Sequence, residues 1–206
     1  MLNHRKLSII AGVSYLAIFF SAIYANFFAL ELLINNPVEA VSNNSFHISL
    51  GAVAFLVAAV FDVIVAWALY HIYKDNILST LSTYFRIIHA AIMAAAVVFL
   101  LDTITLTDSS SILNKVEQFN NLWLIGLFFF GFHLILLGKI VKEVKIIPNI
   151  LVLAGVMYIL DTGAHFLFAN YDVYADVFLM MVAVPAILGE MSFSLWLLFT
   201  GFKNKL

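Results

Sequence analysis

Six long apolar stretches dominate this sequence, and each is close to the length that a helix needs to cross a membrane. They cover residues 7–30, 46–73, 77–106, 122–140, 150–169 and 174–202. A hydrocarbon layer of about 30 Å requires about 20 helical residues, at a rise of about 1.5 Å per residue. The stretches therefore predict an all-α, polytopic integral membrane protein with six transmembrane helices.

The composition also indicates a membrane protein, and it excludes several kinds of functional site. Of the 206 residues, 64% are hydrophobic and 11% are charged, and the mean hydropathy is +1.06. A soluble domain averages about 45–50% apolar and about 25% charged residues. The absence of cysteine excludes disulfides, thiolate nucleophiles and Cys-ligated metals, and a net charge of −2 gives no indication of nucleic-acid binding. We expect one six-helix domain over residues 1–206.

Basic residues between the spans and at their ends predict the orientation. With one exception they fall on one side of a six-span arrangement: Arg5, Lys6, Lys74, Lys139, Lys142, Lys145, Lys203 and Lys205. The opposite side carries Lys115 and a group of acidic residues: Glu31, Glu39, Asp108, Glu117, Asp172 and Asp176. Because cytoplasmic loops carry the excess of Lys and Arg, both termini are predicted to be cytoplasmic, in a multi-pass protein of the cell membrane.

Ionisable side chains also occur inside the apolar stretches, where they are costly. Those that lie well inside a stretch are Asp62, Arg86, His89, His133, Asp161 and Glu190. Such groups usually face the interior of a helix bundle and pair with one another. We therefore expect Arg86 to neutralise Asp62, Glu190 or both. Two interpretations remain open, namely a structural ion pair that fixes helix register and a functional polar cavity.

One arginine can fully neutralise only one of the two carboxylates, so a surplus acid is expected. The resulting hypothesis is that Glu190 and His133 line a hydrated pocket beside Arg86, where at least one of them takes up and releases a proton.

Two further groupings raise the question of cofactors. Asp161 and His165 are spaced i,i+4 and share a helix face, which is compatible with metal ligation, although a simple hydrogen-bonded pair is the commoner arrangement. His89 and His133 could hold a haem if they faced each other at the same depth. The sequence assigns no cofactor.

Six phrases in order complete the pattern: AGVSYLAI (11–18), FDVIVAWALY (61–70), YFRIIHAAIM (84–93), GLFFFGFHLILLGKIV (126–141), IIPNILVLAGVMYIL (146–160) and VPAILGEMSFSLWLLFTG (184–201). Through them the chain resembles the prokaryotic multi-pass family known as domain of unknown function 4386. The resemblance places nine residues at motif positions: Asp62, Tyr70, Arg86, His133, Gly138, Pro148, Gly155, Tyr158 and Glu190. His89 and Asp161-Thr162-Gly163 depart from the family pattern. The resemblance brings no activity with it.

The leading functional expectation is therefore a protein that binds or transports a small polar solute or a proton through a charged intramembrane cavity. Its candidate binding residues are Asp62, Arg86, His133, Tyr158 and Glu190. One alternative is an intramembrane enzyme acting on a lipid or isoprenoid, with or without a metal. Another is a non-catalytic structural module. The expected partners are membrane lipids and a small-molecule ligand, and no nucleic acid.

Overall fold

Seven α-helices account for nearly all of residues 3–203, which is the part of the chain that this computed structural model describes. They are α1 (His4–Ala25), α2 (Glu31–Asn35), α3 (Pro37–Ile72), α4 (Ile77–Asp102), α5 (Ser109–Ile140), α6 (Ile147–Leu167) and α7 (Tyr171–Phe202). A π-helical turn, Asn26–Leu30, joins α1 to α2, and a 3₁₀ turn, Thr103–Thr105, extends α4. Six helical segments of the described chain are long and apolar enough to cross a membrane, which confirms the predicted all-α, six-helix architecture.

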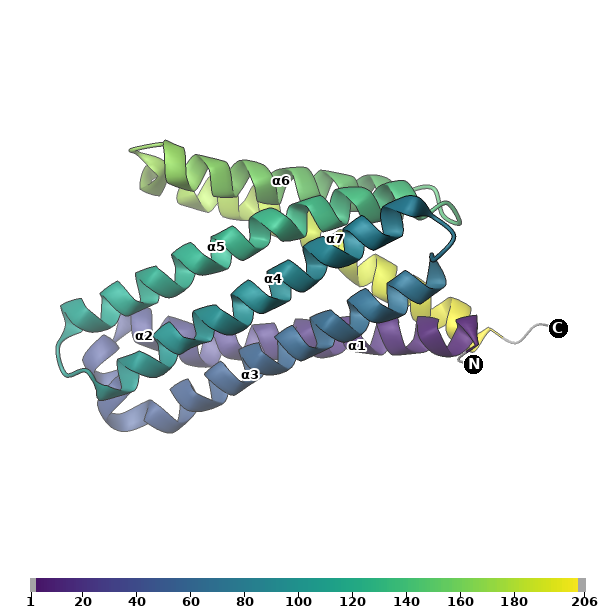
Figure 1. The fold of residues 1–206 in the computed structure, drawn as a ribbon. Helices are drawn as coiled ribbons and strands as arrows, with labels where there is room; N and C mark the ends of the chain where they lie inside the picture. Colours follow the sequence, from purple (N-terminus) through teal and green to yellow (C-terminus); the bar gives the residue numbers. More distant parts are fainter. Residues whose placement is uncertain (1–2, 204–206) are drawn as a thin grey trace.

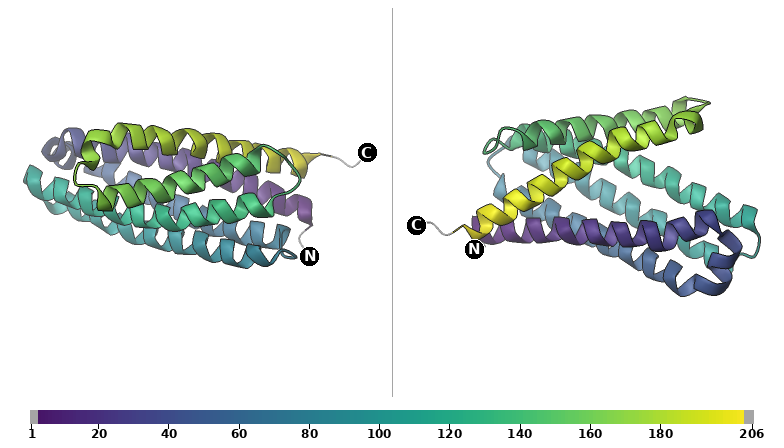
Figure 2. Two further views of the ribbon diagram at one scale, coloured as in Figure 1. Left: turned by 90° about the horizontal axis from the view of Figure 1, so that it is seen from above. Right: turned by 180° about the vertical axis from the view of Figure 1, so that it is seen from behind.

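The helices run back and forth along one long axis, so both termini lie at the same end of the bundle (Figure 1). We call this the terminal end and the opposite one the distal end. Successive long helices pack side by side from α1 through α3, α4, α5 and α6 to α7. Helix α7 lies beside α6 at the distal end and crosses to α1 at the terminal end (Figure 2), which brings the first and last spans together.

Small residues allow several of these helices to approach closely. A Cβ atom on Gly131 of α5 would lie 2.6 Å from the carbonyl oxygen of Gly155 in α6. Between α1 and α7, the Ser194 hydroxyl donates to the Gly12 carbonyl at 2.9 Å. Small side chains of this kind are typical of tightly packed membrane helices. These contacts position the helices that carry the site described below.

Buried apolar side chains form two clusters along the bundle. The terminal-end cluster includes Leu7, Ala11, Leu69, Leu134, Leu137 and Leu197. The distal-end cluster includes Leu33, Ile48, Phe55, Leu100, Ile112 and Phe119. Most of the buried charged side chains belong to the segments between these two clusters, so an apolar layer lies on either side of them.

Two predicted boundaries were wrong. The fourth span was predicted to begin at residue 122, but α5 begins at Ser109. Asp108 caps this helix by accepting a hydrogen bond from the Ser111 amide at 2.8 Å, and hydrogen bonds from the Ser110 side chain and from Ser111 lower the pKa of the Asp108 carboxyl. The second span was predicted to begin at residue 46, whereas α3 begins at Pro37 and only kinks at Asn44, where φ is −129° and ψ is 23°.

Candidate functional site

Arg86 is the centre of a buried polar cluster. Its side chain is 0% exposed and makes three hydrogen bonds to three other spans. Nη2 donates to Asp62 Oδ1 at 2.6 Å, while Nη1 donates to the Tyr15 hydroxyl at 2.8 Å and to His133 Nε2 at 3.0 Å. The predicted ion pair is therefore present, and its acid is Asp62.

Aromatic rings flank the same guanidinium. The Arg86 Cζ atom lies 4.7 Å from the centroid of the Tyr15 ring and 5.1 Å from that of Phe130. Such contacts are favourable for a desolvated cation. Among residues 3–203, Arg86 Nε has no hydrogen-bond partner. The guanidinium is thus fixed in position by α1, α3 and α5, and in the described chain its Nε–H is left without a partner.

His133 acts as a support for Arg86. Its Nδ1 lies 3.0 Å from the Ser82 carbonyl oxygen, and only an N–H can bond to that oxygen. Its Nε2 must then be unprotonated to accept from Arg86, so the ring is the neutral Nδ1–H tautomer. The side chain is buried and does not line the cavity described next. The hypothesis that His133 and Glu190 line one pocket therefore does not match the structure, because Ser82 and Arg86 hold the imidazole between α4 and α5.

A cavity of about 190 Å³ lies beside this cluster, and every one of the six spans contributes to its wall. Four of the predicted site residues line it: Asp62, Arg86, Tyr158 and Glu190. The apolar part of the wall includes Phe19, Met93, Trp123, Leu127, Phe130 and Ile187. The cavity thus combines a small group of charged side chains with a mainly apolar and aromatic surface, as ligand pockets generally do.

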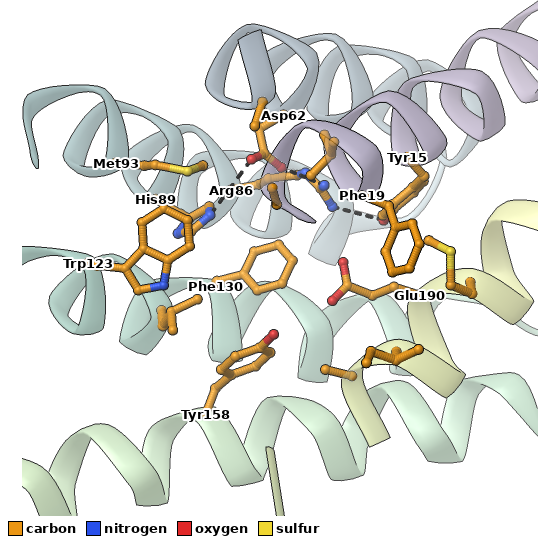
Figure 3. Close-up of a pocket in the computed structure, with 17 residues that line it drawn as sticks. Tyr15, Phe19, Asp62, Arg86, His89, Met93, Trp123, Phe130, Tyr158 and Glu190 are labelled. Atoms are coloured by element: carbon orange, nitrogen blue, oxygen red, sulfur yellow. Dashed lines mark hydrogen bonds and ion pairs between the residues drawn. The ribbon is translucent and has the colours of Figure 1, made fainter. Parts of the chain in front are cut away.

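Glu190 differs from Asp62 in having no partner. Figure 3 shows its carboxylate pointing from α7 into the cavity, across from Asp62. In the described part of the chain, no hydrogen bond or ion pair involves this carboxylate, whereas Asp62 bonds to Arg86. Because Arg86 is held by Asp62, Tyr15 and His133, Glu190 is left as the surplus acid.

His89 also borders the cavity. Its Nε2 lies 3.7 Å from Asp62 Oδ2, which becomes an ion pair only when the imidazole is protonated. Within residues 3–203 its Nδ1 has no hydrogen-bond partner, and the ring packs 4.7 Å from the Phe130 ring. His89 is therefore a second group near Arg86 whose protonation would change the charge of the site.

The candidate metal ligands lie elsewhere and have separate partners. Asp161 Oδ1 accepts from the Tyr171 hydroxyl at 2.6 Å, and His165 Nε2 bonds to Asn121 Oδ1 at 3.1 Å. Residues 3–203 contain no group of three or more His, Asp and Glu side chains that could hold a metal ion. The haem hypothesis fits poorly for a related reason, since both ring nitrogens of His133 are engaged in hydrogen bonds.

The sequence alone did not lead to three residues of the site: Tyr15, Ser82 as the partner of His133, and Trp123. Tyr15 lies in the first apolar stretch, with apolar residues around it and no charged residue nearby in the sequence. The useful signal was its spacing from Ala11 and Ile18, which places all three on one face of a helix. Trp123 falls one residue after the predicted start of its span, where an aromatic residue is usually interpreted as an interface anchor.

Comparisons with known proteins identify relatives without assigning a function. A family model described as "Domain of unknown function (DUF4386)" matches residues 10–201. An uncharacterized protein from Archaeoglobus fulgidus is 31% identical over 157 residues, which cover 73% of this chain and 83% of the archaeal one. No solved structure matches.

Proposed function

The chain belongs to the family described as domain of unknown function 4386, and we propose that it binds a proton or a small polar solute in its intramembrane cavity and carries it across the membrane. The observation that supports this proposal is the state of Glu190. A carboxylate without a partner, facing a cavity inside a membrane protein, is a group that can take up and release a cation.

The contrast between the two acids gives each a role. Asp62 holds Arg86 through a 2.6 Å ion pair, so its protonation would leave a buried guanidinium uncompensated. Glu190 faces the cavity, so its protonation costs no ion pair. Glu190 is therefore the working group, and the Asp62–Arg86 pair keeps the site polar and fixed in shape.

The cavity also favours transport over a purely structural role. A purely structural module needs the Asp62–Arg86 pair but no cavity beside it, and here the pair borders a cavity of about 190 Å³. An intramembrane enzyme needs a nucleophile, a bound water or a metal within reach of its substrate. The carboxylates, imidazole and phenols of the described lining could serve such chemistry, so the enzyme stays the alternative to transport, and proton flux distinguishes the two.

Transport requires access from both sides in turn. Apolar side chains pack on both sides of the polar cluster: those toward the terminal end include Leu7 and Leu134, and those toward the distal end include Phe55 and Leu100. Conformations that open one layer and then the other are therefore part of the proposal. We further propose that the terminal end faces the cytoplasm of the cell membrane, because Lys74, Lys142 and Lys145 lie there.

Proton flux into proteoliposomes tests this function. The purified protein is reconstituted with a pH-sensitive dye inside, and a potassium gradient with valinomycin supplies an inward driving force. We expect acidification in the wild type and, in Glu190→Gln, the rate of protein-free liposomes. The exposed Glu117 provides the matched control, since Glu117→Gln removes a carboxylate of the same type outside the cavity. A Glu190→Gln rate equal to that of the wild type would contradict the proposal.

A further inference from the structure

The charge of the cavity indicates what it can hold. Asp62 and Arg86 form an ion pair at 2.6 Å, so their charges cancel. The other ionisable side chains of the lining are Tyr15, His89, Tyr158 and Glu190. With the phenols and the imidazole neutral, Glu190 leaves one negative charge in a low-dielectric site, where an unpaired charge is unfavourable. A proton on Glu190 or a ligand with a single positive charge would remove it.

Anionic ligands fit the same site poorly. Their natural partner would be Arg86, but its side chain is 0% exposed and its Nη atoms already donate to Asp62, Tyr15 and His133. Only the buried Nε lacks a partner among residues 3–203. An incoming anion would also meet the Glu190 carboxylate. The site therefore selects against negative charge.

The cavity walls add a second requirement. Aromatic side chains from three helices line the space around Glu190 (Figure 3), namely Tyr15, Phe19, Trp123, Phe130 and Tyr158. Faces of aromatic rings attract organic cations, particularly where water is excluded. The remaining wall is largely aliphatic, so an apolar body on the cation would be buried favourably.

Volume limits the size of that body. A dry cavity of about 150 Å³ accommodates one benzene molecule, and this cavity has about 190 Å³. The space fits one ring or a short branched chain with an amino group attached.

The route of entry agrees with an apolar molecule. Helices α1 and α7 touch near the terminal end, where the Arg5 Nε atom donates to the Gly201 carbonyl at 3.1 Å. Farther along, Ala22 of α1 and Ile187 of α7 both line the cavity, and Ile187 is 51% exposed. Because exposed apolar side chains of a span generally face lipid, we infer that the cavity is reached from the lipid beside Ile187.

From charge, walls, size and entry together, we propose that the cavity binds a protonated primary amine with a compact apolar body, with the ammonium group on Glu190 and the body among the aromatic rings. This inference rests on the proposed function, because it takes Glu190 as the working carboxylate. It goes beyond that function by naming the class of ligand.

Binding of three molecules of similar shape tests the proposal. Benzylamine carries a positive charge at neutral pH, benzyl alcohol is neutral, and benzoate is negative. Trp123 lies in the wall, so its fluorescence reports occupancy in purified protein in which Trp67 and Trp196 are replaced by Phe. We expect saturable binding of benzylamine alone, weakened by roughly tenfold or more in Glu190→Gln, since the charge partner is lost.

Two further variants keep the test decisive. Glu117→Gln should bind benzylamine as the parent does. Ala22→Phe, which retains Glu190 and narrows the entrance, should weaken binding even if Glu190→Gln does not fold. Equal or tighter binding of benzoate, or unchanged benzylamine affinity in both cavity variants, would overturn the proposal. Glu190-dependent proton flux without amine binding would reject the amine and leave the proposed function intact, whereas amine binding without flux would reject only the transport step.

Discussion

Two carboxylates in one cavity have different surroundings, and this difference is the main result at the scale of residues. Asp62 bonds to a fully buried guanidinium, whereas the described structure gives Glu190 no partner. Burying an ion pair is roughly neutral in energy when the pair stays intact, but removing one member leaves an uncompensated charge. Asp62 and Arg86 should therefore depend on each other for stability, and Glu190 should contribute less to stability than either.

The first prediction concerns this dependence. Arg86→Ala should destabilise the protein by about 3–5 kcal/mol, the typical cost of breaking a buried pair from one side. Asp62→Ala should have a similar effect, and the double variant should recover part of the summed loss. Unfolding of the purified protein in mild detergent, followed by circular dichroism, measures all four states of the cycle. Strictly additive losses would mean that the two side chains are not coupled.

A second ion pair of this protein serves as the control for that cycle. Lys115 Nζ lies 2.8 Å from Asp102 Oδ2, with side chains 29% and 45% exposed. Exposed pairs contribute only about 0–1 kcal/mol, so Lys115→Ala should change stability far less than Arg86→Ala. An equal loss of stability in Lys115→Ala and Arg86→Ala would mean that the measured loss does not depend on burial of the ion pair.

At the scale of residues, the sequence predicted that Arg86 would pair with a carboxylate, but it did not predict which carboxylate. The cost of an unpaired guanidinium in a membrane predicts that Arg86 needs a carboxylate, and only Asp62 and Glu190 were at a suitable depth. The choice between them depends on where α7, which packs against α1 and α6, stands relative to α3 and α4, and a local pattern does not specify that. The role of His133 was mispredicted for the same reason, since its contact with Ser82 arises only when α4 and α5 pack.

At the scale of helices, glycine contacts decide how the cavity wall is held. Gly155 of α6 lies against the backbone of Gly131 in α5, and an added Cβ would also meet Ile135 Cγ1 at 2.8 Å. Tyr158 lies one turn farther along α6 and lines the cavity. The distance between α5 and α6 therefore sets the position of Tyr158 relative to Glu190.

Two glycines of the same helix give a matched test of this packing. Gly155→Ala should destabilise the protein by about 1–3 kcal/mol, the usual effect of overpacking a tight contact. Gly163 has no atom within 4 Å of an added Cβ, so Gly163→Ala should be neutral or stabilising by about 0.5–1 kcal/mol, because alanine favours the helix. Melting temperatures in one detergent compare the two, and equal losses would argue against a close α5–α6 contact.

The start of α5 shows that a helix can extend beyond the apolar stretch from which it was predicted. Residues 109–121 were not assigned to a span because they contain many polar side chains. They are helical because Asp108 caps them and because Ile112, Val116 and Phe119 are buried in the distal-end cluster. The i, i+4, i+7 spacing of these three residues was the available signal.

At the scale of the whole molecule, the ring of helices places the polar cluster well inside the bundle, somewhat nearer its terminal end. Arg86 lies nine residues from the start of α4, about 14 Å from the terminal end at the rise of an α-helix. Glu190 lies twelve residues before the end of α7, about 18 Å from the same end. Length and hydropathy were sufficient to predict the six spans, but the cavity arises from the crossing of α7, which they do not determine.

Orientation in the membrane is the prediction that belongs to this scale. The chain contains no cysteine, so single cysteines can be introduced without a background. A cysteine at Lys142, at the terminal end, should react with a membrane-impermeant maleimide only after the cells are opened. A cysteine at Asp108, at the distal end, should react in intact cells. The reverse pattern would invert the proposed topology.

The central claim is that Glu190 is free to exchange a proton inside the membrane while Asp62 is held by Arg86. Infrared difference spectroscopy of the reconstituted protein tests it directly, because a protonated carboxyl group has its own C=O stretching band. We predict a carboxyl band that changes with bulk pH, is absent in Glu190→Gln and persists in the control Glu117→Gln. A pH-dependent band that is unchanged in Glu190→Gln, or no such band in the wild type, would contradict the account.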